Sequence, residues 1–426
     1  MKLGLACGEV VSAEVRADMR ILVVSQYYPP ETNAPANRMS KMAQVWARSG
    51  ADVTVLTGFP NHPEGAVYPG YRNRTPQVEH CNGVRVVRVP IFVAANEGRV
   101  KRSLAYLSFA LSGASIGATL VQRPDVVVAT SPQLLVAALG VWLARLFDRP
   151  FVLDLRDLWP DSVVAVGAAS EDSPMVRGLR HLERFVYRSA QHIVIVSEGF
   201  RPHLSACGIP DERISFVPNG VDAGLFKPSA PDPEHWDPAL FTLIFAGTVG
   251  LAHGLGTILD AASQLRDAPV RFLIVGSGAE RATLEQRARE EDLGNVHFLG
   301  RVARQRIPAL LAAANVALIT LRPSPLFETV LPSKLFEAMG CSTPIFLAVD
   351  GEARRLLDES QAGVFVEPGN ARELVKTIQR FSSPDDSSAG EQLKNMGEAG
   401  RSFVLDSFER EALADSYLAL LRGIAE

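Results

Sequence analysis

The chain contains 426 residues, which is more than one ordinary hydrophobic core organises, so two or three domains are expected. Hydrophobic residues make up 47% and charged residues 21% of the sequence, which is typical of a globular protein and excludes a disordered chain. The 43 Lys and Arg against 47 Asp and Glu leave a formal net charge of −4, which disfavours general nucleic-acid binding.

The cysteines are far apart in the sequence. They are Cys7, Cys81, Cys207 and Cys341, and no two have the spacing of a metal-binding or redox pair. We therefore expect neither a disulfide framework nor a zinc site, and a reducing cytoplasm fits this usage. Residues 1–18 have no convincing strand or helix pattern, and their apolar run is too short for a signal peptide. We interpret them as an N-terminal extension, either disordered or from an over-called start.

From Met19 onward, runs of strand-forming residues alternate with loops and helical patterns. The runs show no polar alternation, as expected for parallel strands that are buried on both faces. This pattern predicts a doubly wound α/β domain over residues 19–218, in which ligands bind at the carboxyl ends of the strands. The expected strands are 19–25, 52–57, 84–90, 125–130, 151–156 and 191–197, and the expected helices are 36–49, 104–122 and 132–147.

Two loops of this first domain carry polar candidates. Glu31, Asn33 and Arg38 lie in or after the loop that follows the first strand, and they are candidate ligand-site residues or plain solvated loop residues. Arg156 and Asp157 follow a later strand, as does Asp161, in the run Arg-Asp-Leu-Trp-Pro-Asp. Because polar residues at the carboxyl end of a strand are typical of ligand sites, Arg156 and Asp157 are site candidates, and the alternative is an Arg–Asp pair that fixes a loop.

Some familiar site patterns are missing from the sequence. The first loop has no G-x-G-x-x-G, which argues against a dinucleotide in this domain. No D-x-D motif occurs, so a metal-dependent mechanism is not expected.

The helix expected at 104–122 is largely apolar, and the basic segment Arg99-Val-Lys-Arg comes directly before it. Two interpretations stay open for it. One is a core helix, and the other is a helix that rests on an anionic membrane surface.

The second half repeats the pattern over residues 219–426. Its first strand leads into the Gly-rich loop Gly247-Thr-Val-Gly-Leu-Ala-His-Gly254, where glycine lets the backbone approach a phosphate. A second, weaker Gly signal begins at Gly276. The expected strands are 241–246, 270–275, 296–302, 316–321 and 343–349, and the expected helices are 255–266 and 279–292.

A short helix with clear boundary signals follows Pro332. Ser333 is the expected N-cap and Gly340 the expected end. The backbone amides of Ser333, Lys334 and Leu335 would face an anion at the helix N-terminus, and the Lys334 side chain adds a full positive charge. Glu337 would repel a phosphate but can accept hydrogen bonds from sugar hydroxyls, so we predict a ribose there.

Three motifs together resemble the retaining GT-B glycosyltransferases of family 4, the glycosyl transferases group 1. They are Val-Pro-Asn-Gly-Val-Asp at 217–222, the Gly-rich loop at 247–254, and Pro-Ser-Lys-x-x-Glu-Ala-Met-Gly at 332–340. The form of the last motif is similar to a subgroup that builds bacterial surface polysaccharide, including O-antigen and capsule transferases of the fucosamine type. The resemblance implies two Rossmann-like domains that face a cleft, the first binding acceptor and the second binding nucleotide sugar. In the first domain it assigns the acceptor site to Glu31, Asn33, Arg38 and Asp161, and it makes Arg156 a phosphate or acceptor contact that Asp157 orients. It also implies that the last helix, at 408–424, crosses back to the first domain.

The chain departs from the family pattern at several site positions. The family's first Glu corresponds to Thr329, with Glu328 one residue early, and the resemblance assigns one of these two to the transferred sugar. The family's diphosphate-binding Arg and Lys correspond to Thr248 and His253. The remaining site candidates are Gly250 in the Gly-rich loop, Val302 beside the base, and Lys334, Arg156 and Arg301 as phosphate contacts.

The resemblance therefore implies a glycosyltransferase that uses neither cofactor nor metal. Its expected donor is a nucleotide diphosphate sugar, UDP-linked and N-acetylated, and its expected acceptor is lipid-linked or a saccharide. We expect a cytoplasmic protein, with peripheral contact to the inner membrane as a further expectation. The alternatives are a GT-B nucleotide-sugar 2-epimerase and a non-catalytic nucleotide-sugar-binding partner protein. An NAD(P)-dependent enzyme is disfavoured by the missing fingerprint.

Overall fold

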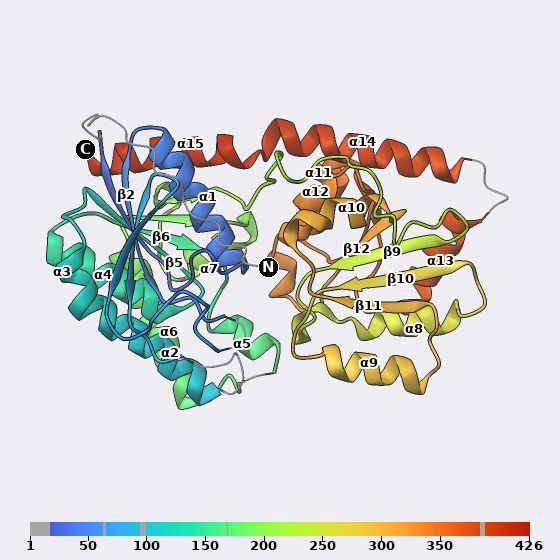
Figure 1. The fold of residues 1–426 in the computed structure, drawn as a ribbon, viewed down its shortest axis with the longest axis horizontal. Coiled ribbons are helices and arrows are strands. Elements are labelled where there is room, and N and C mark those ends of the chain that lie inside the picture. The colour runs from blue at the N-terminus through green and yellow to red at the C-terminus, as the bar shows by residue number, and fades with distance from the viewer. Residues whose placement is uncertain (1–17, 63–64, 94–98, 168, 384–387) are drawn as a thin grey trace.

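The computed structural model describes residues 18–62, 65–93, 99–167, 169–383 and 388–426. They form two α/β domains, each built on a mainly parallel sheet with helices on both faces (Figure 1). The expected pair of doubly wound domains is confirmed. Of the expected extension 1–18, only Asp18 lies among the described residues, and its carboxylate accepts a hydrogen bond of 2.6 Å from Arg422.

The first sheet has eight strands in the order β3-β4-β2-β1-β5-β6-β7-β8, and only β3 is antiparallel to its neighbour. The chain winds outward from β1 in one direction and from β5 in the other, so the topological switch lies between these two strands. The strands are β1 Arg20–Val24, β2 Asp52–Gly58, β3 Gln77–Cys81, β4 Val84–Val89, β5 Val126–Thr130, β6 Phe151–Leu155, β7 His192–Ile195 and β8 Ile214–Phe216.

The second sheet has six parallel strands in the order β11-β10-β9-β12-β13-β14. Its switch lies between β9 and β12, which places the loops after these strands at the predicted ligand-binding edge. The strands are β9 Phe241–Ala246, β10 Val270–Val275, β11 Val296–Gly300, β12 Val316–Thr320, β13 Ile345–Ala348 and β14 Gly363–Phe365.

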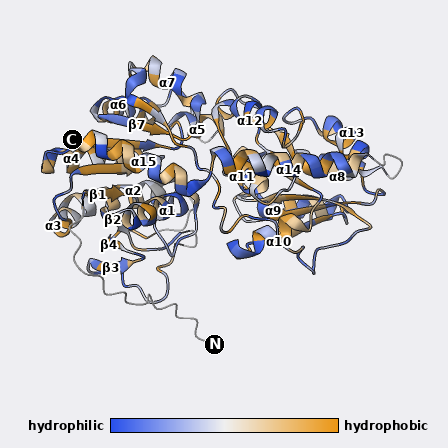
Figure 2. Ribbon diagram, turned by 90° about the horizontal axis from the view of Figure 1, so that it is seen from above, coloured by the Kyte–Doolittle hydropathy of each residue, from blue (hydrophilic) through white to orange (hydrophobic). Residues whose placement is uncertain are grey.

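The helices cover both faces of each sheet, and the strands carry most of the hydrophobic colour in Figure 2. Two apolar clusters lie on opposite sides of each sheet, so the strands are buried on both faces as their unbroken apolar runs predict. In the first domain and its connection the helices are α1 Ala34–Arg48, α2 Arg99–Ser112, the π-helix η1 Gly113–Gly117, α3 Ala118–Leu120, α4 Leu134–Phe147, α5 Asp161–Ala165, α6 Pro174–Ser189, η2 Glu198–Phe200, α7 Arg201–Ala206 and η3 Asp211–Arg213. The later helices are η4 Leu251–His253, α8 Gly256–Gln264, α9 Arg281–Glu290, η5 Arg304–Arg306, α10 Ile307–Ala312, η6 Phe327–Thr329, α11 Ser333–Gly340, α12 Glu352–Ser360, α13 Ala371–Ser382, α14 Ala389–Ser407 and α15 Arg410–Ala425.

The helix predicted at 104–122 differs from the expectation. It begins earlier, at Arg99, and is interrupted by the π-helix η1. By length and composition, the stretch Ser103–Leu120 is apolar enough to cross a membrane. Only 17% of this stretch is buried inside the protein. The core-helix interpretation is therefore wrong for most of this stretch, although Phe109 is fully buried.

The last helix returns to the first domain and packs on α1 (Figure 1). The Trp46 indole donates a 2.9 Å hydrogen bond to the backbone oxygen of Ala414, and its ring meets the Tyr417 ring edge-on at 5.2 Å. Tyr417, Leu418 and Leu421 are buried in the same cluster as β1. Burial of each such side chain contributes about 2 kcal/mol, which anchors α15 on the first domain.

Two buried arginines hold the connection between the domains. Arg38 donates to the carbonyl oxygens of Val217 and Pro218, each at 2.8 Å. Arg410 donates to those of Asn219 and Gly220 at 2.9 and 2.8 Å. Four successive carbonyls are thus bound, which explains in physical terms why the Val-Pro-Asn-Gly-Val-Asp segment has a fixed path.

Gly220 is required in this segment for two reasons. Its φ is +58°, and a Cβ at this position would lie 2.6 Å from the carbonyl oxygen of Phe408. The Val221 amide donates to the same Phe408 oxygen at 2.8 Å. The outgoing and returning crossings of the chain therefore lie side by side and are hydrogen-bonded to each other.

Candidate active site

The N-terminus of α11 lies against the Gly-rich loop that follows β9. The Lys334 side chain extends over Gly247, where an added Cβ would lie 2.1 Å from Lys334 Cε and 2.9 Å from Nζ. The Lys334 ammonium group also lies 4.2 Å from the centre of the Phe245 ring. The structure thus brings together the predicted cation, helix start and glycine loop at the topological switch of the second sheet.

The predicted cap of α11 is wrong. The N-cap is Pro332, and Ser333 is the first helical residue with no side-chain capping bond. The Leu335 amide already donates to the Pro332 oxygen at 3.0 Å, and its side chain is buried in the core. The amides of Ser333 and Lys334 are therefore the first-turn donors that suit an anion.

Burial governs the protonation of this corner. It lowers the pKa of Lys334 to about 7, and the nearby Glu337 carboxylate opposes that change. Burial also lowers the pKa of His253 to about 3, with Lys334 acting in the same direction. Since His253 is neutral at physiological pH, Lys334 is the group of this corner that can change charge there. The shielded Nδ1 of His253 has no hydrogen-bond partner among the described residues.

A second glycine loop supports the first from behind. A Cβ at Gly276 would lie 1.8 Å from the Gly247 oxygen, and one at Gly278 would lie 2.2 Å from the Val249 oxygen. The Val249 amide donates to the Ser277 oxygen at 3.1 Å. Only residues without a side chain allow this backbone-to-backbone contact. Gly276 therefore positions the Gly247 loop.

Glu337 lies one turn after Lys334 on α11. Arg304 donates to its Oε1 at 3.1 Å, and the Arg304 guanidinium also lies 5.2 Å from the Phe226 ring centre. Burial raises the pKa of Glu337, while the Arg304 and Arg410 charges lower it. The sequence prediction missed both arginines, because they come from η5 and the start of α15 and meet Glu337 only in the folded protein.

The segment that precedes α11 docks on the first domain. The Ser197 hydroxyl donates to the Thr329 backbone oxygen and makes no capping hydrogen bond to the helix that follows it. The Thr329 hydroxyl donates to the Leu326 oxygen at 2.7 Å. The Glu328 side chain is exposed. Their assignment to the transferred sugar stays a prediction.

Arg156 is a shielded cation at the end of β6. Its Nε and Nη1 have no hydrogen-bond partner among the described residues, while its backbone amide donates to the Ser131 hydroxyl at 2.7 Å. Burial lowers the pKa of Arg156 to about 10, with Asp154 opposing and Arg38 and Arg410 reinforcing the change. A half-buried guanidinium with two shielded, unused donors suits an anionic ligand.

Asp157 does not form the expected pair with Arg156. Its carboxylate accepts from the Ser162 side chain and the Leu158 amide, and burial raises its pKa to about 6. Asp161, the first residue of α5, pairs with Arg180 at 3.1 Å. Both carboxylates thus have protein partners that fix the loop between β6 and α5.

The acceptor candidates of the first loop are committed to protein contacts. Glu31 is buried and accepts from the amides of Tyr28, Asn61 and His62 at 3.3, 3.0 and 2.9 Å. Asn33 caps α1 by accepting from the Ala36 amide at 3.0 Å. These side chains hold the loop in shape, and an acceptor contact by either of them stays a prediction.

Arg38 is buried as well and forms a 2.9 Å ion pair with Asp154 on β6. Its side chain is 2% exposed and that of Asp154 is not exposed at all. Arg38 therefore joins α1, β6 and the interdomain connection, and its sequence assignment as a site residue overlooked this structural role.

The remaining donor candidates lie around the same edge of the second sheet. Thr248 and Arg301 are exposed, and Gly250, Gly254 and Val302 are half-buried. Gly254 has a φ of +61° and closes the Gly-rich loop before α8. Their positions are compatible with nucleotide binding, and the contacts themselves stay predictions.

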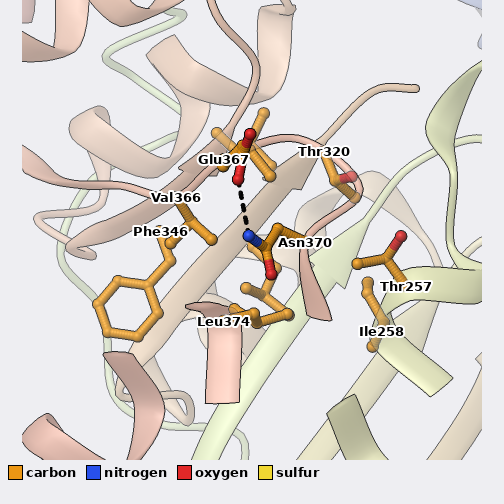
Figure 3. Close-up of a pocket in the computed structure, with 11 residues that line it drawn as sticks. Thr257, Ile258, Thr320, Phe346, Val366, Glu367, Asn370 and Leu374 are labelled. Carbon is orange, nitrogen blue, oxygen red and sulfur yellow. Dashed lines mark hydrogen bonds between the residues drawn. The ribbon is translucent and has the colours of Figure 1, made fainter. Parts of the chain in front are cut away.

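Two other features of the second domain do not overlap the predicted site. An apolar cavity lies between the second sheet and helices α8 and α13, beside a 2.6 Å hydrogen bond from Asn370 to Glu367 (Figure 3). None of the sequence-predicted site residues line this cavity.

Asp232, Glu234 and His235 lie close together and are residue types that can bind a metal ion. The Arg306 guanidinium, however, donates to Asp232 at 2.7 and 3.1 Å and occupies the carboxylate oxygens.

Comparison with known proteins matches each of the two domains to a glycosyltransferase family. Residues 33–220 match the family described as Glycosyl transferase 4-like domain, and residues 228–403 match Glycosyl transferases group 1. The chain is 27% identical to a putative colanic acid biosynthesis glycosyl transferase, WcaI of Escherichia coli, over 85% of this chain and 92% of that protein. It is 26% identical to the probable glycosyltransferase WbjE of Pseudomonas aeruginosa over 95% and 98% of the two chains.

Solved structures support the fold. Sucrose-phosphate synthase from Thermosynechococcus elongatus superposes with a TM-score of 0.77 at 19% identity, covering 95% of this chain and 98% of that one. Anabaena HepE in complex with UDP and glucose gives a TM-score of 0.68 at 19% identity, covering 95% and 99%. These likenesses show the GT-B fold. The two family matches, which together span most of residues 33–403, show that the chain is a glycosyltransferase built from a glycosyl transferase 4-like domain and a group 1 domain.

Proposed function

We propose that this glycosyltransferase moves a sugar from a nucleotide diphosphate sugar to a lipid-linked or saccharide acceptor during assembly of a bacterial surface polysaccharide. A UDP-linked N-acetyl sugar is the proposed donor, and the anomeric configuration is retained. The relative WcaI, a putative colanic acid biosynthesis glycosyl transferase, supports the polysaccharide assignment, and the probable glycosyltransferase WbjE supports the transfer activity. The family resemblance is the basis for retention and for the donor.

The contact between Lys334 and Gly247 carries the donor-site proposal. The ammonium group, the first amides of α11 and the loop backbone converge on one point at the sheet edge. This combination suits a diphosphate, because it supplies a full charge, a helix-end partial charge and close backbone approach. Glu337, one turn further along α11, is then in the right direction for the hydroxyls of the attached ribose.

The reaction breaks the bond between the sugar and the phosphate oxygen, and the electron pair leaves with the diphosphate. Lys334 and the α11 N-terminus would stabilise the charge that develops on this leaving group. An oxygen of the leaving phosphate would take the proton of the acceptor hydroxyl, whose oxygen forms the new bond to the anomeric carbon on the same face. No protein carboxylate is needed as nucleophile in this sequence of events.

Arg156 is proposed to bind the acceptor or the leaving diphosphate from the first domain. Its two shielded nitrogens have no protein partner among the described residues, so a ligand oxygen would satisfy them. The proposed reaction needs no metal ion, because Lys334 and Arg156 supply the positive charge. We propose a cytoplasmic location for the enzyme, where nucleotide sugars are available.

The test is release of nucleoside diphosphate from UDP-, GDP- and ADP-sugars, with and without a chelator. The proposal predicts slow turnover of one donor that survives the chelator and falls about a hundredfold in Arg156→Met, an effect typical of removing a transition-state donor. Arg149→Met, in the first domain but outside the proposed site, serves as the matched control. Turnover that requires added metal would overturn metal independence, and the absence of turnover with any donor would favour a non-catalytic binding protein.

A further inference from the structure

The outer helices of the first domain pack side by side and carry exposed apolar and basic side chains. Helices α2, α4 and α6 lie side by side at the lower left of Figure 1. A Cβ at Gly113, directly after α2, would lie 2.5 Å from Leu139 of α4. The Arg145 guanidinium of α4 lies 5.1 Å from the centre of the Phe185 ring of α6. These contacts make the three helices a single layer, which we call the α2–α4–α6 face.

Large apolar side chains are concentrated on this face. Of the twelve large hydrophobic residues that are exposed among the described ones, eight lie on α2, η1, α4 or α6. Leu107 and Leu111 of α2 are 44% and 62% exposed, and Leu146 of α4 is 52% exposed. The others on this face are Leu104, Ile116, Trp142, Met175 and Phe185. A patch this extensive on a soluble domain marks an interaction surface.

The exposed charges of the face are all positive. Its described basic side chains that are exposed are Lys101, Arg145, Arg177, Arg184 and Arg188. The one carboxylate within the three helices is Glu183, which is buried and accepts from Tyr187 and His203. The acidic residues Asp148, Glu171 and Asp172 lie in the loops beyond the helix ends.

The two halves of the chain have net charges of opposite sign, and the half that contains this face is the positive one. Residues 19–218 contain 21 Lys and Arg against 16 Asp and Glu, a net charge of +5. Residues 219–426 contain 20 against 28, a net charge of −8. The first domain is therefore attracted to a negative surface that repels the second domain.

We infer that the α2–α4–α6 face binds the surface of an anionic lipid bilayer. Its leucines and Trp142 would enter the boundary between headgroups and acyl chains, while the arginines bind lipid phosphates. Self-association through this face is disfavoured, because a symmetric dimer would bring the exposed basic side chains of one copy against those of the other, with no exposed carboxylate of the three helices to compensate them. The contact would hold the first domain at the membrane, where a lipid-linked acceptor would be found, and it does not depend on the proposed donor chemistry.

The test is sedimentation of the full chain with vesicles of phosphatidylcholine, with or without phosphatidylglycerol. The inference predicts that the protein sediments with the anionic vesicles, not with the neutral ones, and is released by high salt. Arg184→Glu with Arg188→Glu should lower the bound fraction relative to the free about tenfold or more, because each basic residue near such a surface contributes strongly. Arg372→Glu with Lys376→Glu, exposed on α13 of the second domain, makes the same charge change and should retain binding.

The apolar part is tested in the same way. Leu107→Glu with Leu111→Glu should abolish sedimentation, whereas Trp236→Glu, at a 48% exposed apolar residue of the second domain, should not. The melting temperature of each variant without lipid shows that the fold is intact. Failure of the parent protein to sediment with anionic vesicles would overturn the inference. So would lipid-free dimers that dissociate in the Leu107→Glu, Leu111→Glu variant, because a second copy would then cover the face.

Discussion

The ammonium-bearing end of Lys334 lies so close to the backbone of Gly247 that a single methyl group on Gly247 would lie 2.1 Å from Lys334 Cε. The two residues are 87 positions apart in the sequence, one on the loop after β9 and one on the first turn of α11. Their contact aligns the charge of the side chain with the partial charge of the helix end. The donor-site proposal depends on this alignment.

The Gly247→Ala variant should therefore displace the Lys334 side chain and weaken nucleotide diphosphate binding about tenfold or more, the usual cost of a lost hydrogen bond to a charged group. Gly294→Ala is the matched control, because this glycine of the second domain lies outside the candidate site and an added Cβ there has no neighbour within 4 Å. Calorimetric titration of both variants with the preferred diphosphate measures the difference. Equal affinities in the two variants would contradict the role given to the Lys334–Gly247 contact.

Nucleotide affinity should fall as the pH rises above about 7. The pKa of Lys334 is about 7 because of burial, and a bound diphosphate favours the ammonium form. Binding above that pH then requires proton uptake, which lowers affinity by up to about tenfold per pH unit. The Lys334→Ala variant should lose this slope. The prediction fails if the parent protein and the variant have parallel affinity profiles between neutral and alkaline pH.

Stability without ligand should change in the opposite direction. The pKa of Lys334 is about 7 in the folded protein and 10.5 when unperturbed, so the unfolded chain binds more protons between these values. The Lys334 contribution to the free energy of unfolding therefore rises with pH across that window. Urea unfolding of the parent protein and of Lys334→Ala at several pH values measures this contribution as their difference.

Glu337→Gln should weaken binding of the nucleotide through its ribose. Loss of hydrogen bonds to a carboxylate costs about 1.5–3 kcal/mol, or roughly tenfold to a hundredfold in affinity. The same substitution should change the affinity for a 2′,3′-dideoxy diphosphate little, because that ligand lacks the hydroxyls. Calorimetry of two proteins with two ligands completes the thermodynamic cycle. An equal loss for both ligands would show that Glu337 acts elsewhere than on the ribose.

Arg38→Met should destabilise the protein strongly. The Arg38–Asp154 pair is almost completely buried, and removal of one partner leaves an uncompensated charge that costs about 3–5 kcal/mol. Arg20→Met removes one side of the Arg20–Asp125 pair, whose side chains are 45% and 30% exposed, and should cost less than about 1 kcal/mol. Urea unfolding compares the two. If Arg38→Met is no less stable than Arg20→Met, the structural role assigned to Arg38 is wrong.

The sequence predicted the buried strands best. β9 Phe241–Ala246 and β10 Val270–Val275 have the expected bounds, because unbroken apolar runs between turn residues leave few other structures. Three strands were missed: β8 and β14 have only three residues each, and β3 is half-exposed at a sheet edge and shows a weaker apolar pattern. Its signal was the Asn82-Gly83 turn, where φ is +51° and +81° and the chain reverses into β4.

Within the candidate site, local sequence signals predicted the residues on one helix better than the contacts between distant segments. The spacing of Lys334 and Glu337 on one helix was predictable, whereas the start of that helix was not, because Pro332 takes the N-cap position with an extended backbone. Arg304 and Asp154 were missed since their partners, Glu337 and Arg38, are 33 and 116 residues away. Such pairs depend on the tertiary fold, which one sequence does not specify residue by residue.

The most direct test of the account is calorimetric titration of the parent protein and of Lys334→Ala with UDP, GDP and ADP and with the corresponding nucleosides. We expect one diphosphate to bind, and we expect Lys334→Ala to lose affinity for it while its weak affinity for the nucleoside is unchanged. Binding of no diphosphate, or equal binding of the preferred one by both proteins, would contradict a diphosphate site at the N-terminus of α11.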